Sequence, residues 1–154
     1  FQKDYVNTNR IHIEPLTPAL CSECLDFLED WCQEHGCDQE TQNDLACEKA
    51  AAINMLKYIG DFDVKGLVLR IDGQISAYGI GARLTREIGV FHFEKAFASV
   101  KGLYQFFDNL CADELFKEYA YINKESDMNL EGLAKAKKSY HPAMMVKSYI
   151  LSLR

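Results

Sequence analysis

Two ionisable residues near the end of an apolar stretch, His92 and Glu94, are the first candidates for chemistry in this sequence. The alternation predicts a β-strand whose two faces carry Ile88, Val90, His92 and Glu94 on one side and Gly89, Phe91, Phe93 and Lys95 on the other. A carboxylate with a raised pKa can take a proton from an attacking amine, and a histidine can relay a proton because it titrates near neutral pH. We therefore predict Glu94 as a general base and His92 as a catalytic histidine. The alternatives are structural ion pairs around Glu94 and Lys95, binding of the substrate amine by Glu94, and a hydrogen-bonded core position for His92.

Ser99, Lys101 and Gly102 follow this strand and offer a hydroxyl, a positive charge and an accessible backbone amide, which together suit a phosphate group. They lie at the start of a helix predicted over residues 101–116. The turn between a strand end and a helix N-terminus is where open α/β sheets bind their ligands. The sequence thus predicts an anion site at this turn. The structural alternative is that Ser99 caps the helix and Gly102 permits tight packing.

Six cysteines form the other group with chemical potential. Cys21 and Cys24 have the spacing of metal ligands, and further cysteines and His35 follow. One helix cannot direct them all at a single tetrahedral centre, however, and they recur at helical intervals beside Phe27 and Trp31, as core residues do. We therefore predict no metal site and no disulfide framework. Reduced cysteines fit a cytoplasmic protein.

The composition is that of an ordinary globular domain. With 154 residues, of which 48% are hydrophobic and 26% charged, the chain suits one domain with a sizeable core. The net charge of −6 argues against binding nucleic acid through the overall field of the domain, although lysines between residues 135 and 147 make the C-terminal quarter basic. The short apolar runs predict no transmembrane segment, and no secretory leader is recognised.

Hydrophobic periodicity and turn signals predict the scaffold that positions the candidate residues. The predicted elements are, in order, strand 10–14, helices 17–33 and 38–59, strands 66–71, 74–84 and 88–95, helix 101–116, strand 119–123, helix 130–138 and strand 144–151. Asp72 and Gly73 signal a two-residue hairpin, and Gly79 and Gly81 invite a bulge or a close backbone approach. Because a helix joins strands 88–95 and 119–123, these two strands should be parallel.

Four segments of the sequence resemble those found in members of a known family. They are His92-Phe-Glu-Lys95, Lys101-Gly102, Tyr121-Ile-Asn-Lys-Glu125 and Ser139-Tyr-His-Pro142. The similarity covers nearly the whole chain and is to the bacterial phosphatidylglycerol-lysyltransferase-like family, whose members carry two tandem GNAT-like domains. The resemblance implies an α/β, GNAT-like acyltransferase fold. Its mixed central sheet is antiparallel in the N-terminal strands, has a parallel pair at the crossover helix and is flanked by helices. Residues 1–154 would be one such domain, the C-terminal half of a longer protein, with an N-terminal GNAT-like domain as its partner.

The resemblance also implies transfer of an acyl or aminoacyl group to an amine or hydroxyl, on a small-molecule or lipid acceptor. GNAT enzymes take the group from an acyl-CoA such as acetyl-CoA and hold its diphosphate on backbone amides at the start of the crossover helix, which corresponds here to Ser99, Lys101 and Gly102. The family fingerprint has two spaced glycines at this point, whereas this chain has only Gly102. That departure suits relatives that use aminoacyl-tRNA as the donor.

Two further residues gain roles from the resemblance. Tyr140 lies in the region where many GNAT enzymes place a tyrosine as general acid for the leaving group; the alternative is a core tyrosine. Asn123 is placed to bind amide groups of the donor or to close the loop that follows it. A domain without catalysis, serving as a binding or structural half, is the alternative function. An open cleft between the strand ends, lined by Glu94 and Tyr140, favours an enzyme, whereas a cleft filled by Phe93, Phe97 or Tyr121 favours the binding role.

Overall fold

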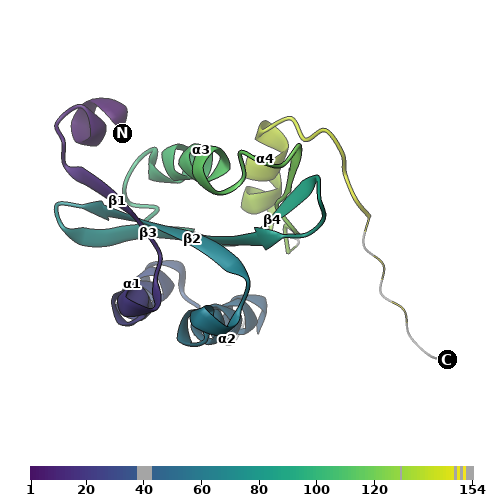
Figure 1. Cartoon of the computed structure of the whole chain (residues 1–154), viewed down its shortest axis with the longest axis horizontal. Coiled ribbons are helices and arrows are strands. Elements are labelled where there is room, and N and C mark those ends of the chain that lie inside the picture. The colour runs from purple at the N-terminus through teal and green to yellow at the C-terminus, as the bar shows by residue number, and fades with distance from the viewer. Residues whose placement is uncertain (38–42, 129, 148, 150, 152–154) are drawn as a thin grey trace.

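A five-stranded sheet forms the centre of the computed structural model, which describes residues 1–37, 43–128, 130–147, 149 and 151 (Figure 1). The strands lie side by side in the order β1 (Ile11–Pro15), β2 (Val64–Ile71), β3 (Gln74–Arg83), β4 (Ile88–Ala96) and β5 (Tyr121–Asn123). Strands β1 to β4 pair with one another in antiparallel fashion, whereas β5 pairs with β4 in parallel. This mixed sheet confirms the predicted fold.

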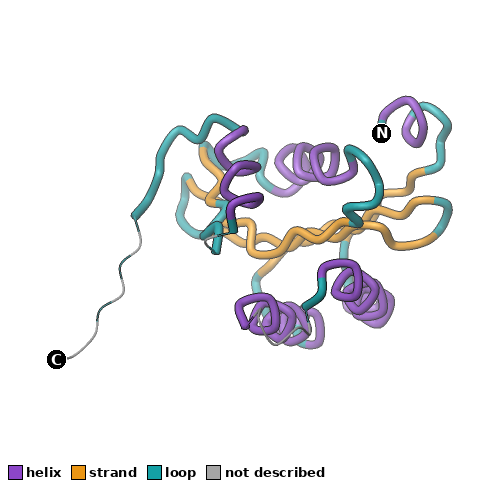
Figure 2. The backbone as a smooth tube through the Cα atoms, turned by 180° about the vertical axis from the view of Figure 1, so that it is seen from behind, coloured by secondary structure: helices purple, strands orange, loops and turns teal. Residues whose placement is uncertain are grey.

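Helices cover both faces of the sheet (Figures 1 and 2). One side carries α1 (Cys21–His35) and α2 (Asn43–Lys57), and the other carries α3 (Leu103–Leu115) and α4 (Glu131–Ser139). Three short turns complete the helical elements, namely η1 (Gln2–Val6), η2 (Pro18–Leu20) and η3 (Ile59–Asp61). Each face closes over its own hydrophobic cluster. In the part of the chain that the structure describes, none of these helices has the length and apolar character needed to cross a bilayer.

Helix α1 shows how the sequence builds one side of the core. Its buried residues recur every three or four positions and are Cys24, Phe27, Leu28, Trp31 and Cys32. Gly36 ends the helix in the left-handed region at a φ of 68°, and its N–H donates to the carbonyl of Cys32. These cysteines are core residues, as their helical spacing predicts. Among the described residues, no group of His, Cys, Asp and Glu side chains has an arrangement that would hold a metal ion.

The hairpin between β2 and β3 confirms the turn predicted at Asp72 and Gly73. Both residues have positive φ, 50° and 86°, as a type I′ turn requires. The helix predicted over residues 38–59 is described as α2 over Asn43–Lys57. The sequence favours Asp38 as the cap of this helix and Leu45 as part of its buried stripe, but Asp38 and the side chain of Leu45 lie outside the described residues.

A β-bulge in β4 changes which residues share a face. Phe91 is opposite Gly81, and Phe93 is opposite Ile80, so His92 is an extra residue on β4. Phe91 therefore packs in the cluster beneath α3, whereas Phe93 packs against the cluster of α1 and α2. The strict alternation predicted for this strand is wrong, because a period of two does not anticipate an inserted residue. The disturbance predicted at the glycines of β3 is confirmed by the register shift between Ile80 and Gly81.

Strands β4 and β5 separate after a short common stretch. They pair only over Ile88–Val90 and Tyr121–Asn123, although β4 continues to Ala96. The strand predicted over residues 119–123 is correspondingly shorter. In the described part of the chain, the end of β4 thus lacks a neighbouring strand on its β5 side. A cavity opens at this point.

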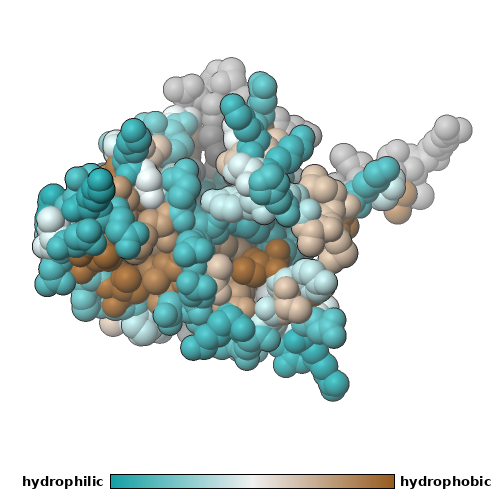
Figure 3. Space-filling model, turned by 90° about the horizontal axis from the view of Figure 1, so that it is seen from above, coloured by the Kyte–Doolittle hydropathy of each residue, from teal (hydrophilic) through white to brown (hydrophobic). Residues whose placement is uncertain are grey.

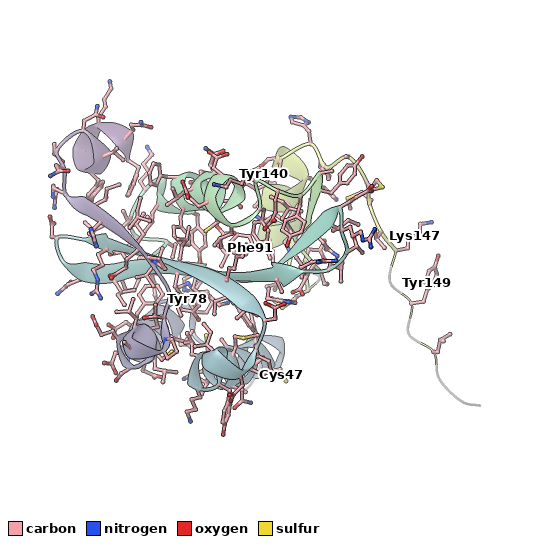
Figure 4. All side chains as sticks on the ribbon, in the orientation of Figure 1. Cys47, Tyr78, Phe91, Tyr140, Lys147 and Tyr149 are labelled. Carbon is pink, nitrogen blue, oxygen red and sulfur yellow. The ribbon has the colours of Figure 1, made fainter. Side chains whose placement is uncertain are left out.

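The strand predicted over residues 144–151 is wrong. Its described residues, 144–147, 149 and 151, form no strand and extend away from the sheet (Figures 1 and 4). Val146 is 89% exposed and Leu151 is 95% exposed. The apolar composition of this segment favours a strand, but a strand also needs a sheet edge with which to pair.

Candidate active site

A cavity of about 1130 Å³ lies where β4 and β5 separate, large enough for a small molecule or the end of a larger one. Its ionisable lining includes Glu94, Lys95, Lys124, Glu125, Lys137 and Tyr140. Its aromatic lining consists of Trp31, Phe91, Phe93, Tyr104 and the ring of Tyr140. Figure 3 shows the face of the molecule that carries α3 and α4, where apolar surface lies between hydrophilic side chains.

Lys124 joins two carboxylates on the α3 side of this cavity. Its Nζ lies 3.3 Å from Oε2 of Glu94 and also contacts Oδ1 of Asp108. The same nitrogen is 5.3 Å from the ring centroid of Phe91 and 4.9 Å from that of Tyr140, and both rings lie on the α3 side of the sheet (Figure 4). Strand β4, helix α3, the loop after β5 and the end of α4 each supply one polar member, so residues far apart in the sequence converge here.

Glu94 has the environment of a general base. Burial raises its pKa to about 7, while the positive charge of Lys124 opposes the shift and the negative charge of Asp108 adds to it. The side chain is 18% exposed and faces the cavity. A carboxyl group that titrates near neutral pH is matched to proton transfer at that pH. The catalytic role of Glu94 remains a prediction, and this environment supports it.

Tyr140 caps the C-terminal end of α4 and lines the cavity. Burial and the neighbouring Asp108 carboxylate raise its pKa above the ordinary range of a tyrosine, although about half of the residue is exposed. The phenol therefore keeps its proton at neutral pH and can donate it. The raised pKa also makes the phenol a weaker acid, so the role of Tyr140 as general acid remains a prediction.

His92 and Asn123 are bound to the loop after β5. Nδ1 of His92 lies 2.9 Å from Oε1 of Glu125, and Oδ1 of Asn123 accepts a hydrogen bond of 2.8 Å from the backbone N–H of Glu125. Asn123 thus closes the loop, which is one of the two roles considered for it. Within the described residues, no direct hydrogen bond joins His92 to Glu94, so the predicted proton relay lacks a direct path.

Lys137 of α4 fixes the loop that carries Lys124. Its Nζ donates to the carbonyl oxygens of Lys124 and Ser126 at 2.5 and 2.6 Å. Burial, followed by the charge of Lys124, lowers the pKa of Lys137. The basic residues of the C-terminal quarter therefore include one that anchors the site.

The turn predicted as an anion site is bound by a carboxylate of the chain itself. The backbone N–H groups of Ala98 and Ser99 both donate to the side chain of Glu34, each at 3.0 Å. Gly102 precedes α3 with a φ of 81°, and the first residue of the chain packs against it, so that an added Cβ would lie 3.3 Å from that side chain. Ser99, Lys101 and Gly102 lie outside the cavity lining.

The opposite wall of the cavity holds a second charge pair. Lys95 follows Glu94 directly and so points to the other face of β4. Its Nζ lies 2.5 Å from Oε1 of Glu48 on α2 and 4.0 Å from the ring centroid of Trp31. The indole N–H of Trp31 donates to the hydroxyl of Tyr104 at 2.9 Å, and burial raises the pKa of that tyrosine to about 12. Lys95 thus pairs across to α2 and not with its neighbour in the sequence.

Three residues of the site were not predicted from the sequence: Asp108, Lys124 and Lys137. Asp108 did carry a signal, because it lies beside Phe107 and Cys111 in the buried stripe of α3. A carboxylate on an apolar helix face needs a partner, and Lys124 supplies it. Lys137 appeared only as one of a cluster of lysines on a short helix.

Comparison with known proteins adds a family match. A protein-family model described as "Phosphatidylglycerol lysyltransferase, C-terminal" matches residues 1–152. No curated protein matches the chain. A crystal structure of a conserved protein of unknown function from Bacteroides thetaiotaomicron VPI-5482 is 33% identical, with a TM-score of 0.84. The match covers 94% of this chain and 47% of that chain, so this chain spans about half the length of that structure.

More distant structures share the fold. A ribosomal-protein-alanine N-acetyltransferase from Brucella melitensis biovar Abortus 2308 is 15% identical with a TM-score of 0.64, covering 94% of this chain and 99% of that one. A predicted acetyltransferase from Clostridium acetobutylicum, solved with acetyl-CoA, is 12% identical with a TM-score of 0.56, covering 94% and 96%. The chain therefore has the fold of GNAT acetyltransferases.

Proposed function

We propose that this chain, which belongs to the phosphatidylglycerol lysyltransferase C-terminal family, transfers an acyl or aminoacyl group from an ester or thioester to an amine or hydroxyl. The fold and the family support an acyltransferase in general. The observation that carries the proposal is Glu94, with a pKa raised to about 7 by burial, in the open cavity between β4 and β5. Tyr140 also lines this cavity. Of the three aromatic residues considered as able to fill it, Phe93 is part of the lining, whereas Phe97 and Tyr121 are not.

In the proposed reaction Glu94 takes a proton from the attacking amine or hydroxyl. The nucleophile forms a bond to the acyl carbon and gives a tetrahedral oxyanion. As this intermediate collapses, the bond from the acyl carbon to the ester oxygen or thioester sulfur breaks, and Tyr140 donates its proton to that leaving atom. Glu94 then loses its proton to solvent and Tyr140 regains one. Lys124 holds Glu94 in place and offsets part of the negative charge that Glu94 shares with Asp108.

The donor considered from the sequence is an acyl-CoA or an aminoacyl-tRNA. In this fold an acyl-CoA would present its diphosphate to the turn of Ser99, Lys101 and Gly102, which offers a hydroxyl, a charge and backbone N–H groups. The turn as it stands does not fit that group, because the N–H groups of Ala98 and Ser99 already donate to Glu34. We therefore assign no step of the reaction to coenzyme A.

An N-terminal GNAT-like domain of a longer protein is the proposed partner. The family description places the matching region at a C-terminus, and the chain covers 47% of the Bacteroides structure. The acceptor would be a small amine or a lipid that reaches the cavity beside Glu94. Its identity follows from the transfer experiment below.

A non-catalytic binding half is the second candidate, and one observation favours it. The turn before α3 has a single glycine and its first two N–H groups are occupied by Glu34. In a domain that no longer binds a donor, side chains of the same chain can occupy the N–H groups of that turn, as Glu34 does here. The two candidates differ in one measurable respect, because only an enzyme depends on the carboxylate of Glu94.

A transfer assay on the full-length protein tests the proposal. The donors are radiolabelled lysyl-tRNA and acetyl-CoA, and the acceptors are phosphatidylglycerol vesicles and a small primary amine. We expect Glu94→Gln to lower the rate about 100-fold at pH 7. Glu87→Gln is the matched control, since Glu87 is an exposed carboxylate in the turn before β4. A loss below threefold in folded Glu94→Gln protein would overturn the proposed role, and no transfer by the wild type with either donor would favour the binding half.

A further inference from the structure

The turn before α3 binds the carboxylate of Glu34 through its backbone N–H groups, as such a turn would bind an anionic ligand. Two successive backbone N–H groups, those of Ala98 and Ser99, converge on one carboxylate at 3.0 Å each. Hydrogen bonds of this kind to an ionised acceptor are stronger than those between neutral groups. Burial alone would raise the pKa of Glu34, but the bonds from Ser99 and Ala98 outweigh it and lower the pKa, so the side chain is a carboxylate at neutral pH.

The position of Glu34 in α1 makes this contact informative. It is the last residue but one of Cys21–His35, at the end of the helix where the backbone carbonyls concentrate negative charge. A carboxylate is disfavoured there, so its contacts in the fold must offset that cost. The bonds to the turn, together with His35 Nδ1 at 3.8 Å, are what stabilise it in this place.

We propose that Glu34 is a specificity-determining residue that excludes donors carrying a diphosphate, coenzyme A included, from the turn between β4 and α3. A diphosphate bound there would lose two N–H donors and would meet a fixed negative charge at close range. The acyl group would then reach the cavity on a carrier that presents no diphosphate to this turn. This inference rests on the proposed function, because it concerns which acyl carrier that site accepts.

The test is isothermal titration of coenzyme A into the full-length protein and three variants. Glu34→Ala removes both the charge and the occupant, and Glu34→Gln removes the charge while keeping the size. Asp30→Ala is the matched control, because Asp30 is an exposed carboxylate one turn earlier on α1. Binding at any other site of the full-length protein contributes equally to all four proteins, so the differences report on this turn.

We expect Glu34→Ala to bind coenzyme A at least tenfold more tightly than wild type, Glu34→Gln to gain less, and Asp30→Ala to gain nothing. A fourth variant, Glu34→Ala/Lys101→Ala, should lose at least threefold of the gain, since Lys101 is an exposed cation of the same turn. Equal affinity in wild type and both Glu34 variants, or a gain that Lys101→Ala leaves unchanged, would overturn the proposal.

The outcome is separable from that of the transfer assay. Failure here would leave the effect of Glu94→Gln on transfer untouched, because Glu94 acts on the acceptor in the cavity whichever donor is used. Conversely, an unchanged transfer rate in Glu94→Gln would remove the proposed base but not the gain in coenzyme A binding by Glu34→Ala.

Discussion

Glu94 and Lys95 are neighbours in the sequence, but the pleat of β4 sends them to opposite faces of the sheet, and they meet different numbers of opposite charges. Lys95 is 3% exposed and pairs with one carboxylate, Glu48, beneath a tryptophan ring. Glu94 shares its lysine, Lys124, with a second carboxylate, Asp108. On the wall of Lys95, one lysine thus pairs with one carboxylate, and we call this wall balanced. On the wall of Glu94, one lysine is shared by two carboxylates, and we call this wall unbalanced. On this second wall burial raises the pKa of Glu94 to about 7; Lys124 and Lys137 oppose the shift, and the second carboxylate, Asp108, adds to it.

The largest effect that tests this comparison is on stability. Lys95→Met should destabilise the fold by about 3 kcal/mol, because it leaves Glu48 without its partner on the balanced wall. Urea denaturation at pH 7 measures this. The double variant Lys95→Met/Glu48→Met should recover most of the loss, since both charges are then replaced by apolar groups. A loss below 1 kcal/mol in the single variant would mean that the pair is not structural.

On the wall with two carboxylates, replacing the charged residue should stabilise the fold at high pH, whereas Lys95→Met destabilises it. The pKa of Glu94 is raised from 4.5 to about 7, so the folded chain holds this proton more tightly than the unfolded chain does. The stabilisation is fully present below pH 4.5 and is lost as the pH rises through 7. Between pH 4.5 and 8 the stability of Glu94→Gln relative to wild type should therefore rise by about 2–3 kcal/mol, measured by denaturation at several pH values. A constant difference would show that burial does not perturb this group.

Tyr140 tests the proton-donating part of the same wall. Tyr140→Phe should lower the rate of transfer about tenfold, less than a fully buried acid would, because water reaches a half-exposed side chain. The loss should be greater for donors with a poorer leaving group. Tyr149→Phe is the control, since this tyrosine is 78% exposed and lies away from the cavity (Figure 4). Equal rates for Tyr140→Phe and wild type would remove the tyrosine from the mechanism.

Replacing Asp108 should have the smallest effect, and that effect should be confined to the pH dependence of the rate. Its negative charge adds to the raised pKa of Glu94, so Asp108→Asn should lower that pKa and move the acid limb of the activity profile to lower pH. If the pKa of Glu94 falls by about half a unit, the rate at pH 6 should rise about threefold, because the ionised fraction of the base rises by that factor. A pH–rate profile of both proteins measures it. A limb that stays in place or moves to higher pH would contradict the charge comparison.

Local patterns predicted most of the elements. The Asp72-Gly73 hairpin, the apolar stripe of α1 with its terminal Gly36 and the crossover helix all depend on residues close in sequence, and all are found. The C-terminal strand failed because a strand also needs an edge elsewhere in the fold. The bulge at His92 shifted the faces of β4 because it depends on the register with β3.

The candidate site was predictable only in part, for the same reason. The sequence singled out Glu94 by its chemistry near the end of a predicted strand, and Tyr140 through the resemblance to GNAT enzymes. It did not place Asp108 and Lys124 beside them, because three different elements supply this cluster. Nor did it show that Glu34, far away in α1, occupies the turn predicted to bind an anion.

The sequence by itself determined the α/β class, most of the elements in their order and Glu94 as a candidate base, because periodicity, turn residues and side-chain chemistry are local properties; the family resemblance added Tyr140. Only the tertiary structure decided how many charges surround each of them. The pKa of Glu94 depends on burial and on Lys124 and Asp108, which lie 30 and 14 residues away along the chain and within one ion-pair cluster in space. Electrostatic energies follow distance and dielectric environment, and neither is set before the chain has folded.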